Sequence, residues 1–487
     1  MRAVQSQRPT KQQLITLAKE DPETIADLVL SLFDRIDKLE ERIATLELNS
    51  RNSSKPPSTD KGNFTNPPKP KSLRQKSSKK RGAQRNHQGF TLEKKATPDH
   101  LIEHSLPDEV LCKHCDKSFP TTDSSYQSRQ VFDIPPIALE VTEHRVQQCT
   151  CPHCSTITSA SFPPEVKAPV QYGANVQSFC IYLNSYQLIP YKRLAQTFSD
   201  LFNIPLSQGT IANILKKVGA KADLAVQPIR KALQASSILH CDETGCRLNA
   251  QRHWLHVASN KNLSYYQIDA KRGVKALENI GILKGFRGTL IHDCLPSYNY
   301  YKECKHGICN AHILRELVYA EEQDQQSWAK DLQTLLLEAK RRIETSESEL
   351  LQNDKAIVNQ RYRNIVNLGL RLNPDPPKTQ GKRGRPKRSK TLNLLHRLDE
   401  NHRSILAFYN RRGVPFDNNQ AERDLRMMKT REKISAGFGS EAKAKNFCDL
   451  RSVISSSLKQ GHNILEILSE LILSPTETGQ KLASIPE

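Results

Sequence analysis

The most regular apolar pattern in the chain lies near its start, where apolar residues recur at alternating spacings of four and three. The positions are Ile25, Val29, Leu32, Ile36, Leu39, Ile43 and Leu46. Such a heptad seam, flanked by charged residues, predicts a leucine-zipper coiled coil over residues 20–50 that would pair two chains. Three heptads are only marginally stable alone. An amphipathic helix packed on the chain's own core is therefore the alternative interpretation.

Helical periodicity returns over residues 174–188 and 191–202. A turn that contains Pro205 follows, and then a helix over Ser207–Val218. A short turn between two helices, with polar residues at the start of the second, resembles a helix-turn-helix. The pattern indicates a helical, helix-turn-helix-like DNA-binding domain over residues 171–230, and a plain helical scaffold fits it equally well.

The next segment alternates between strand-like and helical patterns. Strand-like runs cover residues 237–241, 253–258, 263–268 and 289–291, with a helical stretch at 271–283 before the last of them. This alternation is typical of an α/β fold. We predict an α/β core at residues 235–440, with a helical insertion at about 313–415, followed by a C-terminal helical segment at 441–487.

Four of the twelve cysteines form two closely spaced pairs, Cys112-x-x-Cys115 and Cys151-x-x-Cys154. Each pair can present two thiolates to one tetrahedral ion, and a small segment with few apolar residues needs a metal to fold. Four unligated buried cysteines would not explain the paired spacing. The pattern therefore predicts a zinc-ribbon-like, zinc-binding domain over residues 99–165.

The residues between the cysteine pairs are expected to form a hairpin, with strands at 130–134 and 138–146 about a Pro-Pro turn. Cys149 is close enough to be a substitute zinc ligand. His114 and His153 lie inside the pairs as weaker candidates.

Charge points to a polyanionic partner. The chain has 72 Lys and Arg against 52 Asp and Glu, and 17 of the 20 excess positive charges fall in residues 51–98 and 374–390. Both segments are poor in large apolar residues, so we expect flexible linkers. Concentrated positive charge on such linkers favours nucleic acid binding over an inert tether.

No apolar stretch approaches the roughly 18–20 residues of a membrane span. The first residues are polar, without the apolar core of a signal peptide. We therefore expect no membrane partner and a cytoplasmic, nucleoid-associated location, where cysteines stay reduced.

Three acids are candidates for metal-dependent chemistry. Asp242 and Asp293 each follow a strand-like run, and Glu422 lies at the start of a predicted helix that continues to Arg431. Carboxylates from strand ends and a facing helix can hold two divalent cations about 3.5–4 Å apart for phosphodiester chemistry. Taken singly, each acid is more often an ordinary cap or strand-end residue. The neighbouring acids Glu243 and Asp417 are expected to point elsewhere.

The same helix offers phosphate contacts beside Glu422. Asn419, Arg426 and Lys429 lie at i−3, i+4 and i+7 from it and so share its face.

Several ordered motifs then identify a resemblance. They are Asn49-Ser50-x-Asn52-Ser53-Ser54-Lys55-Pro56-Pro57-Ser58, the four-cysteine domain, His240-x-Asp242-Glu243-Thr244, His292-Asp293, Cys309-x-x-His312, Asn418-Asn419-x-Ala421-Glu422-Arg423, Lys429, and Ser435-x-Gly437-Phe438. Together with the zipper, they resemble the insertion-sequence-66 (IS66) family of bacterial transposases over nearly the full length of the chain.

The resemblance implies a ribonuclease-H-like catalytic core whose Asp-Asp-Glu triad is Asp242, Asp293 and Glu422. It implies Mg²⁺ or Mn²⁺ as the catalytic cofactor and Zn²⁺ as a structural one. Arg423 joins Arg426 and Lys429 as a DNA-binding candidate. Cys309 and His312 are similar to a structural Cys-x-x-His element of several transposase groups, although a buried helical turn is the slightly preferred reading.

A second basic motif lies in the later linker. Arg383 and Arg385, within Arg383-Gly384-Arg385-Pro386, resemble an AT-hook that enters a narrow minor groove. A merely basic linker is equally compatible with so short a motif.

The implied activity is cleavage at the ends of an insertion sequence and transfer of the exposed 3′-hydroxyl into target DNA. The partners would be the terminal inverted repeats, target DNA, a second copy or more of the chain, and accessory transposition proteins. Two alternatives remain: a catalytically silent DNA-binding protein derived from such an enzyme, and a nuclease without strand transfer.

Overall fold

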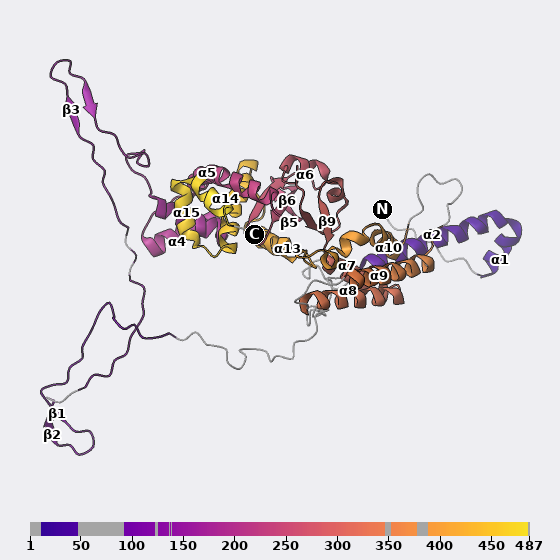
Figure 1. Ribbon diagram of the computed structural model, residues 1–487, viewed down its shortest axis with the longest axis horizontal. Coiled ribbons are helices and arrows are strands. Elements are labelled where there is room, and N and C mark those ends of the chain that lie inside the picture. Colours follow the sequence, from indigo (N-terminus) through magenta and orange to yellow (C-terminus); the bar gives the residue numbers. More distant parts are fainter. Residues whose placement is uncertain are drawn as a thin grey trace. The chain divides into compact units, whose positions relative to one another are not determined.

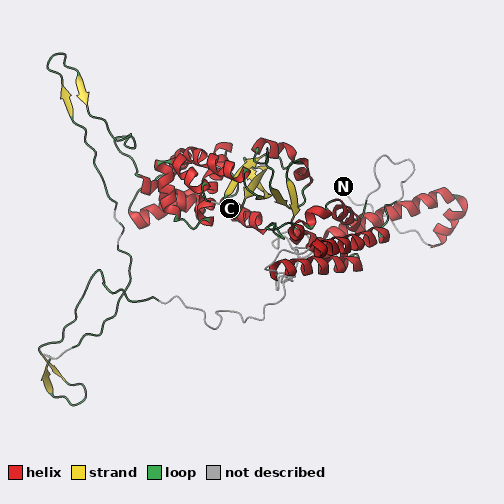
Figure 2. Ribbon diagram, viewed as in Figure 1, coloured by secondary structure: helices red, strands yellow, loops and turns green. Residues whose placement is uncertain are grey.

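The computed structural model describes residues 11–46, 92–121, 125–135, 137, 139–345, 352–376 and 388–485. The chain divides into two compact units, one of residues 1–71, 143–199 and 205–487, the other of residues 72–142 and 200–204. The larger unit contains both helices and strands (Figure 2). Within the described ranges, no helix combines the length and apolarity needed to cross a bilayer.

A five-stranded mixed sheet lies at the centre of the larger unit (Figure 1). Its strands are β5 (Ile238–Leu248), β6 (Gln251–Ser259), β7 (Ser264–Asp269), β8 (Thr289–His292) and β9 (Lys305–Ile308), in the spatial order β7-β6-β5-β8-β9. The first three strands along the chain pair antiparallel, whereas β8 runs parallel to β5 and β9 parallel to β8. The predicted α/β class is confirmed as a mixed α/β arrangement.

Strand β5 is much longer than the sequence pattern predicted. It pairs with β6 continuously from His240 opposite Ser259 to Leu248 opposite Gln251. The two residues between the strands, Asn249 and Ala250, have φ values of 48° and 61°, the left-handed conformation that a tight hairpin turn requires. The expectation that the strand ends at Asp242 is therefore wrong, because pairing with β6 extends it by six residues.

Helices from before and after the sheet in the chain form a group that packs beside strand β7. They are α3 (Ala174–Ile181), the π-helix η2 (Tyr182–Tyr186), α4 (Tyr191–Phe202), α5 (Gln208–Gln234), α14 (Glu441–Lys459), α15 (Ile464–Leu473) and α16 (Pro475–Ala483). Helix α14 packs on β7 and on α5. Its hydroxyls also accept hydrogen bonds from the strand, because the N–H of Tyr266 donates to the Oγ of Ser452 at 3.0 Å.

Two of these helices differ from their predicted extents. A π-helical turn interrupts the helix expected over residues 174–188. Helix α5 starts where expected, capped by the Ser207 Oγ, which accepts the N–H of Thr210 at 3.0 Å, but it continues to Gln234. Its apolar face is buried against α14 and α16, and this packing carries the helix past Val218.

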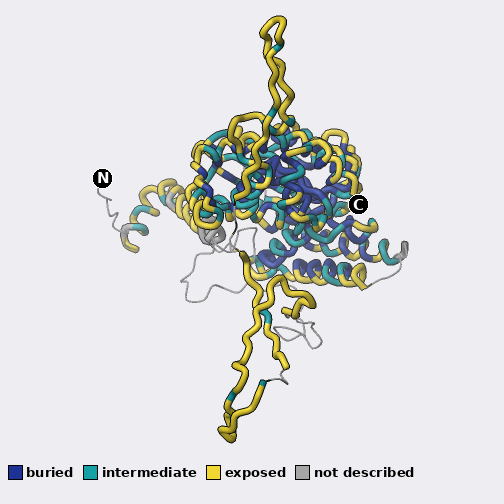
Figure 3. The backbone as a smooth tube through the Cα atoms, turned by 90° about the vertical axis from the view of Figure 1, so that its left-hand side faces the viewer, coloured by how far each residue is buried: buried dark blue, intermediate teal, exposed yellow. Residues whose placement is uncertain are grey.

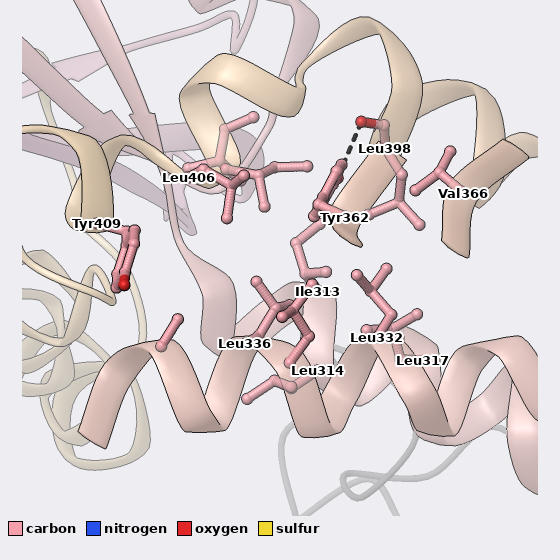
Figure 4. Packing of buried hydrophobic residues seen from close by; sticks show 14 of the residues in the cluster. Ile313, Leu314, Leu317, Leu332, Leu336, Tyr362, Val366, Leu398, Leu406 and Tyr409 are labelled. Carbon is pink, nitrogen blue, oxygen red and sulfur yellow. Dashed lines mark hydrogen bonds between the residues drawn. The ribbon is translucent and has the colours of Figure 1, made fainter. Parts of the chain in front are cut away.

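A helical insertion separates β9 from the rest of the core. It consists of α7 (Asn310–Glu322), α8 (Ser327–Thr345), α9 (Gln352–Leu372), α10 (Lys390–Glu400), α11 (His402–Ile405) and α12 (Ala407–Asn410). Its helices enclose a continuous apolar cluster, in which the hydroxyl of Tyr362 donates to the carbonyl of Leu398 at 2.9 Å (Figure 4). Trp328 is completely buried in this cluster, which also contains Ile291 of β8 and Ile308 of β9, so the insertion shares its core with the sheet.

The insertion begins and ends at the same place. The backbone N–H of Asn310 donates to the carbonyl of Phe416 at 3.1 Å. The side-chain amide of Asn310 donates to the carbonyls of Ile405 at 3.0 Å and Phe416 at 3.3 Å. One buried asparagine therefore joins the entry of the insertion to its exit.

Helix α13 (Asn419–Ser435) follows the insertion and returns the chain to the sheet. It packs against β5 and β6. Ala421, Leu425 and Met428, spaced by four and three residues, are its buried side chains. Smaller elements complete the sheet's surroundings, namely α6 (Val274–Ile280) and the 3-10 helix η3 (Pro296–Tyr300).

The N-terminal segment forms two helices, α1 (Lys11–Glu20) and α2 (Pro22–Leu46). Helix α2 contains the whole heptad seam. Its apolar residues Val29, Leu32, Ile36 and Leu39 are each 43–58% exposed. Burial is instead concentrated in the helices and sheet of the core (Figure 3). Coiled-coil pairing itself stays a prediction.

Candidate functional site

Three carboxylates gather where β5 and β8 run side by side. Asp242 lies inside β5, and Asp293 follows the last residue of β8. The parallel register, with His240 opposite Ile291, brings these two positions to the same level of the sheet. The carboxylate oxygens of Asp242, Glu243 and Asp293 all lie within 4.8 Å of one another. The core therefore holds an all-oxygen cluster of the kind that hard divalent cations bind.

The pKa of Asp242 is strongly raised by its surroundings. Burial, followed by the negative charges of Glu243, Asp293 and Glu422, raises its pKa to about 8. Its Oδ1 accepts the backbone N–H of Glu243 at 2.8 Å, which partly offsets that rise. A cation placed among these carboxylates would relieve the repulsion and favour the ionised form.

Glu243 does not point away from the cluster, contrary to the strand-alternation argument. Its side chain is fully buried and is paired with Arg272, whose Nε donates to Oε1 at 2.6 Å. The hydroxyl of Tyr298 donates to the other oxygen at 2.8 Å. Burial and the charge of Asp293 raise the pKa of Glu243, and the Arg272 charge opposes that rise.

Arg272 connects Glu243 to the neighbouring acid. Its Nη2 lies 3.6 Å from Oδ2 of Asp293, and its guanidinium rests 4.9 Å from the ring centroid of Trp254. The sequence reasoning missed Arg272 and Tyr298. Neither belongs to a recognisable motif, and Arg272 reaches the cluster from the segment after β7, so only the adjacency of Glu243 to Asp242 was a usable signal.

A chain of histidines fixes the turn that carries Asp293. The N–H of Cys294 donates to Nδ1 of His292 at 3.2 Å, so Nε2 of the neutral ring donates to Nδ1 of His306 at 3.1 Å. Nε2 of His306 then donates to the carbonyl of Tyr301 at 3.0 Å. Burial and the neighbouring His306 lower the pKa of His292 to about 3, which keeps this chain neutral.

Glu422 lies apart from the three-acid cluster but within electrostatic reach of it. It is in the first turn of α13, and its charge contributes to the raised pKa of Asp242. Its Oε1 lies 3.8 Å from Nδ1 of His312. The described residues thus contain a second group of potential ligand atoms, made by Cys309, His312 and Glu422 within 4.8 Å of one another.

Cys309 and His312 come from the start of α7. Cys309 is its N-cap residue and is completely buried, and the backbone N–H of His312 donates to the Cys309 carbonyl at 3.2 Å. Burial raises the pKa of the Cys309 thiol to about 12 and lowers the pKa of the His312 imidazole. The thiol is therefore protonated and burial favours the neutral imidazole at pH 7.

Asn418 connects the group of Cys309, His312 and Glu422 to strand β5. Its backbone N–H donates to Sγ of Cys309 at 3.2 Å, and its side-chain amide donates to the carbonyl of Cys241 at 2.8 Å. Its side-chain oxygen accepts from Nδ1 of His240 at 2.8 Å. This buried residue ties the start of α13 to both α7 and the strand that carries Asp242, a role that no sequence pattern indicated.

The basic DNA-binding candidates on α13 face outward. Arg423, Arg426 and Lys429 are all exposed. Lys429 also lies 3.6 Å from Glu432. Asp417 is engaged elsewhere, since its Oδ1 accepts the backbone N–H of Asn419 at 3.1 Å. Arg383 and Arg385 lie outside the described residues.

The first cysteine pair forms a compact knuckle. Cys112 and Cys115 lie between β1 (Glu109–Leu111) and β2 (Ser118–Pro120), which pair antiparallel. The N–H of Cys112 donates to the carbonyl of Lys117, and the N–H of Asp116 donates back to the Cys112 carbonyl, both at 2.9 Å. Backbone hydrogen bonds from His114 and Cys115 lower the pKa of the Cys112 thiol.

The second pair repeats that geometry. Cys151 and Cys154 lie between β3 (Gln148–Thr150) and β4 (Ile157–Ser159), which pair antiparallel. The N–H of Cys151 donates to the carbonyl of Thr156 at 2.9 Å, and the N–H of Ser155 donates to the carbonyl of Cys151 at 2.8 Å. Hydrogen bonds with Thr156 lower the pKa of the Cys154 thiol. Each knuckle therefore presents two thiols at one tight turn, one of them with hydrogen bonds that favour the thiolate, and thiolates are the ligands that structural zinc ions use.

The hairpin predicted between the two pairs is not present in its described residues. Positions 125–135, 137 and 139–147 form no strands, and short strands flank each cysteine pair instead. The prediction failed because β-branched residues alone do not make a sheet, whereas the tight knuckle turns bring their flanking residues into register. Cys149 lies in β3 with an exposed side chain.

Comparisons with known families agree with this arrangement. A family model described as "Transposase IS66 family" matches residues 169–446, more than half of the chain. A model described as "zinc-finger binding domain of transposase IS66" matches residues 109–155, and a family of unknown function, DUF6444, matches residues 6–93. No curated protein matches the chain.

Proposed function

The chain belongs to the IS66 family of transposases, and from this premise we propose that it cuts DNA at the ends of an insertion sequence and transfers the exposed 3′-hydroxyl to target DNA. In the first step, water attacks a phosphodiester and a 3′-oxygen leaves with a proton. In the second, that 3′-hydroxyl attacks a target phosphodiester, so one phosphodiester bond forms for each one broken. Neither step needs an oxidant or an energy-supplying nucleotide.

The observation that carries the proposal is the gathering of Asp242 and Asp293 on adjacent parallel strands, with Glu422 near enough to affect the pKa of Asp242. These oxygen donors fit Mg²⁺ or Mn²⁺. Asp242 would hold both cations, and Asp293 and Glu422 one each. When bound, the cations would activate the attacking oxygen and stabilise the leaving one.

Residues around the acids serve to position them. Asn418 sets the start of α13 against β5, and the His292 chain holds the turn that carries Asp293. Arg272 pairs with Glu243 and would offset part of the repulsion that the Glu243 charge exerts on Asp242. These contacts favour one fixed arrangement of the acids. Catalysis by metal ions requires such an arrangement, because the acids set the positions of the ions.

The sheet supports a ribonuclease-H-like assignment of the core. Three antiparallel strands followed by two strands parallel to the first, in the order β7-β6-β5-β8-β9, would place the first acid on the central strand and the second on its neighbour. The helical insertion over residues 310–410 would then separate the second acid from the third.

The remaining segments would assemble the protein on DNA. The zinc-finger domain, the exposed start of α5 and the basic linkers would bind the terminal repeats, and Arg423, Arg426 and Lys429 would contact phosphates near the acids. The exposed apolar seam of α2 supports pairing of two chains as a coiled coil. Such pairing would hold two element ends together, with accessory transposition proteins as further partners.

The test is nicking and joining of a labelled duplex taken from the DNA that flanks the gene. Asp242→Asn, Asp293→Asn and Glu422→Gln should each abolish both products in Mg²⁺ or Mn²⁺ while leaving duplex binding nearly intact. Each change keeps the side chain's size and removes only its charge. Asp417→Asn is the matched control and should retain cleavage, because Asp417 caps a turn rather than facing the cluster.

The outcomes separate the alternatives. Normal nicking by one of the three variants removes that residue from the site, and normal nicking by all three discards the mechanism. Binding without any nicking by the unaltered protein favours the silent DNA-binding alternative. Nicking without joined product favours the nuclease.

A further inference from the structure

Two orphaned polar atoms face one another between α7 and α13. Within the described part of the chain, Nδ1 of His312 and Oε1 of Glu422 are buried and have no hydrogen-bond partner. They lie 3.8 Å apart, too far for a hydrogen bond with each other. Leaving two buried polar atoms unsatisfied is costly, so a missing group between them would account for the arrangement.

The separation suits a bridging cation. Nitrogen and carboxylate oxygen ligands each lie roughly 2.0–2.2 Å from a bound transition metal, so two ligands of one ion can be up to about 4 Å apart. The third nearby donor is Sγ of Cys309, which lies within 4.8 Å of both other atoms. It is oriented toward the start of α13 by the N–H of Asn418 at 3.2 Å.

We propose that Cys309, His312 and Glu422 form a binding site for a transition metal such as Zn²⁺, separate from the all-oxygen acid cluster. One sulfur, one nitrogen and one oxygen make a donor set that Mg²⁺ avoids and Zn²⁺ or Co²⁺ accepts. Three protein ligands leave a fourth tetrahedral position open for water.

The backbone gives the site its shape. Cys309 and His312 are the N-cap and third residues of α7, so one helical turn presents both donors to the same side. Glu422 comes from the first turn of α13, whose start is bonded to Cys309. Two helix beginnings thus hold all three ligands.

The site goes beyond the proposed function and shares only Glu422 with it. Glu422 cannot coordinate a transition metal here and serve the acid cluster with the same oxygen at the same time. Binding at this site is measured without DNA, so its failure would leave the proposed cleavage chemistry untouched.

Cobalt spectroscopy on the full-length, zinc-containing protein tests the proposal. Co²⁺ added under a non-chelating reductant should produce a sulfur-to-cobalt charge-transfer band that saturates at one equivalent per chain. Cys309→Ser should abolish this band. Cys180→Ala is the matched control and should keep it, because Cys180 is likewise completely buried with a pKa raised to about 12 but lies in α3.

Absence of the band in the unaltered protein, or an equal band in Cys309→Ser, would overturn the site. If Cys309→Ser fails to fold by circular dichroism, His312→Gln and Glu422→Gln decide the matter. Each should weaken Co²⁺ binding by about tenfold or more. Unchanged affinity in both variants rejects the proposal.

Discussion

The side-chain amide of Asn418 donates a hydrogen bond to the backbone carbonyl of Cys241 at 2.8 Å, one residue before Asp242. This bond joins the start of α13 to the middle of β5 across a separation of 177 positions in the chain. Because the carbonyl belongs to the strand that carries one proposed ligand and the amide precedes the helix that carries another, the spacing of those two acids depends on it.

Asn418→Ala should therefore damage both stability and cleavage. It removes the hydrogen bonds from the Asn418 side chain to the Cys241 carbonyl and to Nδ1 of His240, at a cost of about 1–3 kcal/mol in the free energy of unfolding. Denaturant titration measures the loss, and the nicking assay should fall with it. Asn279→Ala, at an exposed asparagine, should change neither, and equal behaviour of the two variants would contradict the positioning role.

Glu243→Gln should raise the Mg²⁺ concentration needed for cleavage by about tenfold. Once the charge of Glu243 is removed, Arg272 would pair more closely with Asp293, whose Oδ2 lies 3.6 Å from its Nη2. Arg272 would then compete with Mg²⁺ for the Asp293 carboxylate. Measurable cleavage should remain at saturating Mg²⁺. Replacing Arg272 by Gln in the same protein should restore the original requirement, and a double variant no better than the single one would refute the competition.

Stability should fall with rising pH because of Asp449. Burial raises its pKa to about 6 despite the ion pair with Lys445 at 2.8 Å. A carboxyl whose pKa is higher in the folded state stabilises that state fully below its unfolded pKa near 3.8, and this stabilisation is lost as pH rises through about 6. Asp449→Asn should thus gain about 3 kcal/mol relative to the unaltered protein between pH 4 and 7. Parallel unfolding midpoints of the two proteins across that range would refute the assignment.

Both cysteine knuckles should be needed to hold a single zinc ion per chain. Cys112→Ser or Cys151→Ser should lower the metal content of protein purified without chelators by one zinc per chain and weaken binding to the element's ends. Metal analysis by mass spectrometry decides the count. Zinc retained in Cys151→Ser would move the fourth ligand to Cys149.

The exposed seam of α2 should govern self-association. Leu32→Pro or Leu39→Pro should lower the molar mass measured by light scattering, because proline breaks the helix that presents the seam. Circular dichroism should still report a folded core. A mass unchanged in both variants and in a chain lacking residues 1–50 would favour the single-chain amphipathic helix.

The local sequence pattern predicted the strands that carry Asp242 and Asp293 but not the residues at which these strands end. The apolar run before Asp293 is a strand that starts where expected, at Thr289, and ends one residue later than expected, at His292. The run before Asp242 continues through Glu243, Thr244 and Gly245, residues that look like a turn in isolation. Only pairing with β6, a tertiary interaction, makes them strand.

The surroundings of the acids were harder to foresee, since they depend on contacts between distant segments. Arg272 and Tyr298 reach Glu243 from 29 and 55 positions away. Asn418 was visible as part of a motif, yet its three partners lie on two other elements. Strand β9, Lys305–Ile308, was not predicted, because its four residues contain a single large apolar side chain and a glycine, which weakens the strand pattern.

The hydrogen bonds from Asn310 to Phe416 also affect the entropy cost of closing the long loop between these residues. These residues are 106 positions apart, and bringing together the ends of a flexible loop costs entropy that grows with the logarithm of its length. Here the intervening helices pack around an apolar cluster that they share with Ile291 of β8 and Ile308 of β9, so the ends meet as a result of that packing. The sheet and α13 are then joined, in effect, by a connection of a few residues. A change in the length of the insertion beyond this junction should therefore leave the separation between β9 and α13 unaltered, provided that the packing on Ile291 and Ile308 is kept.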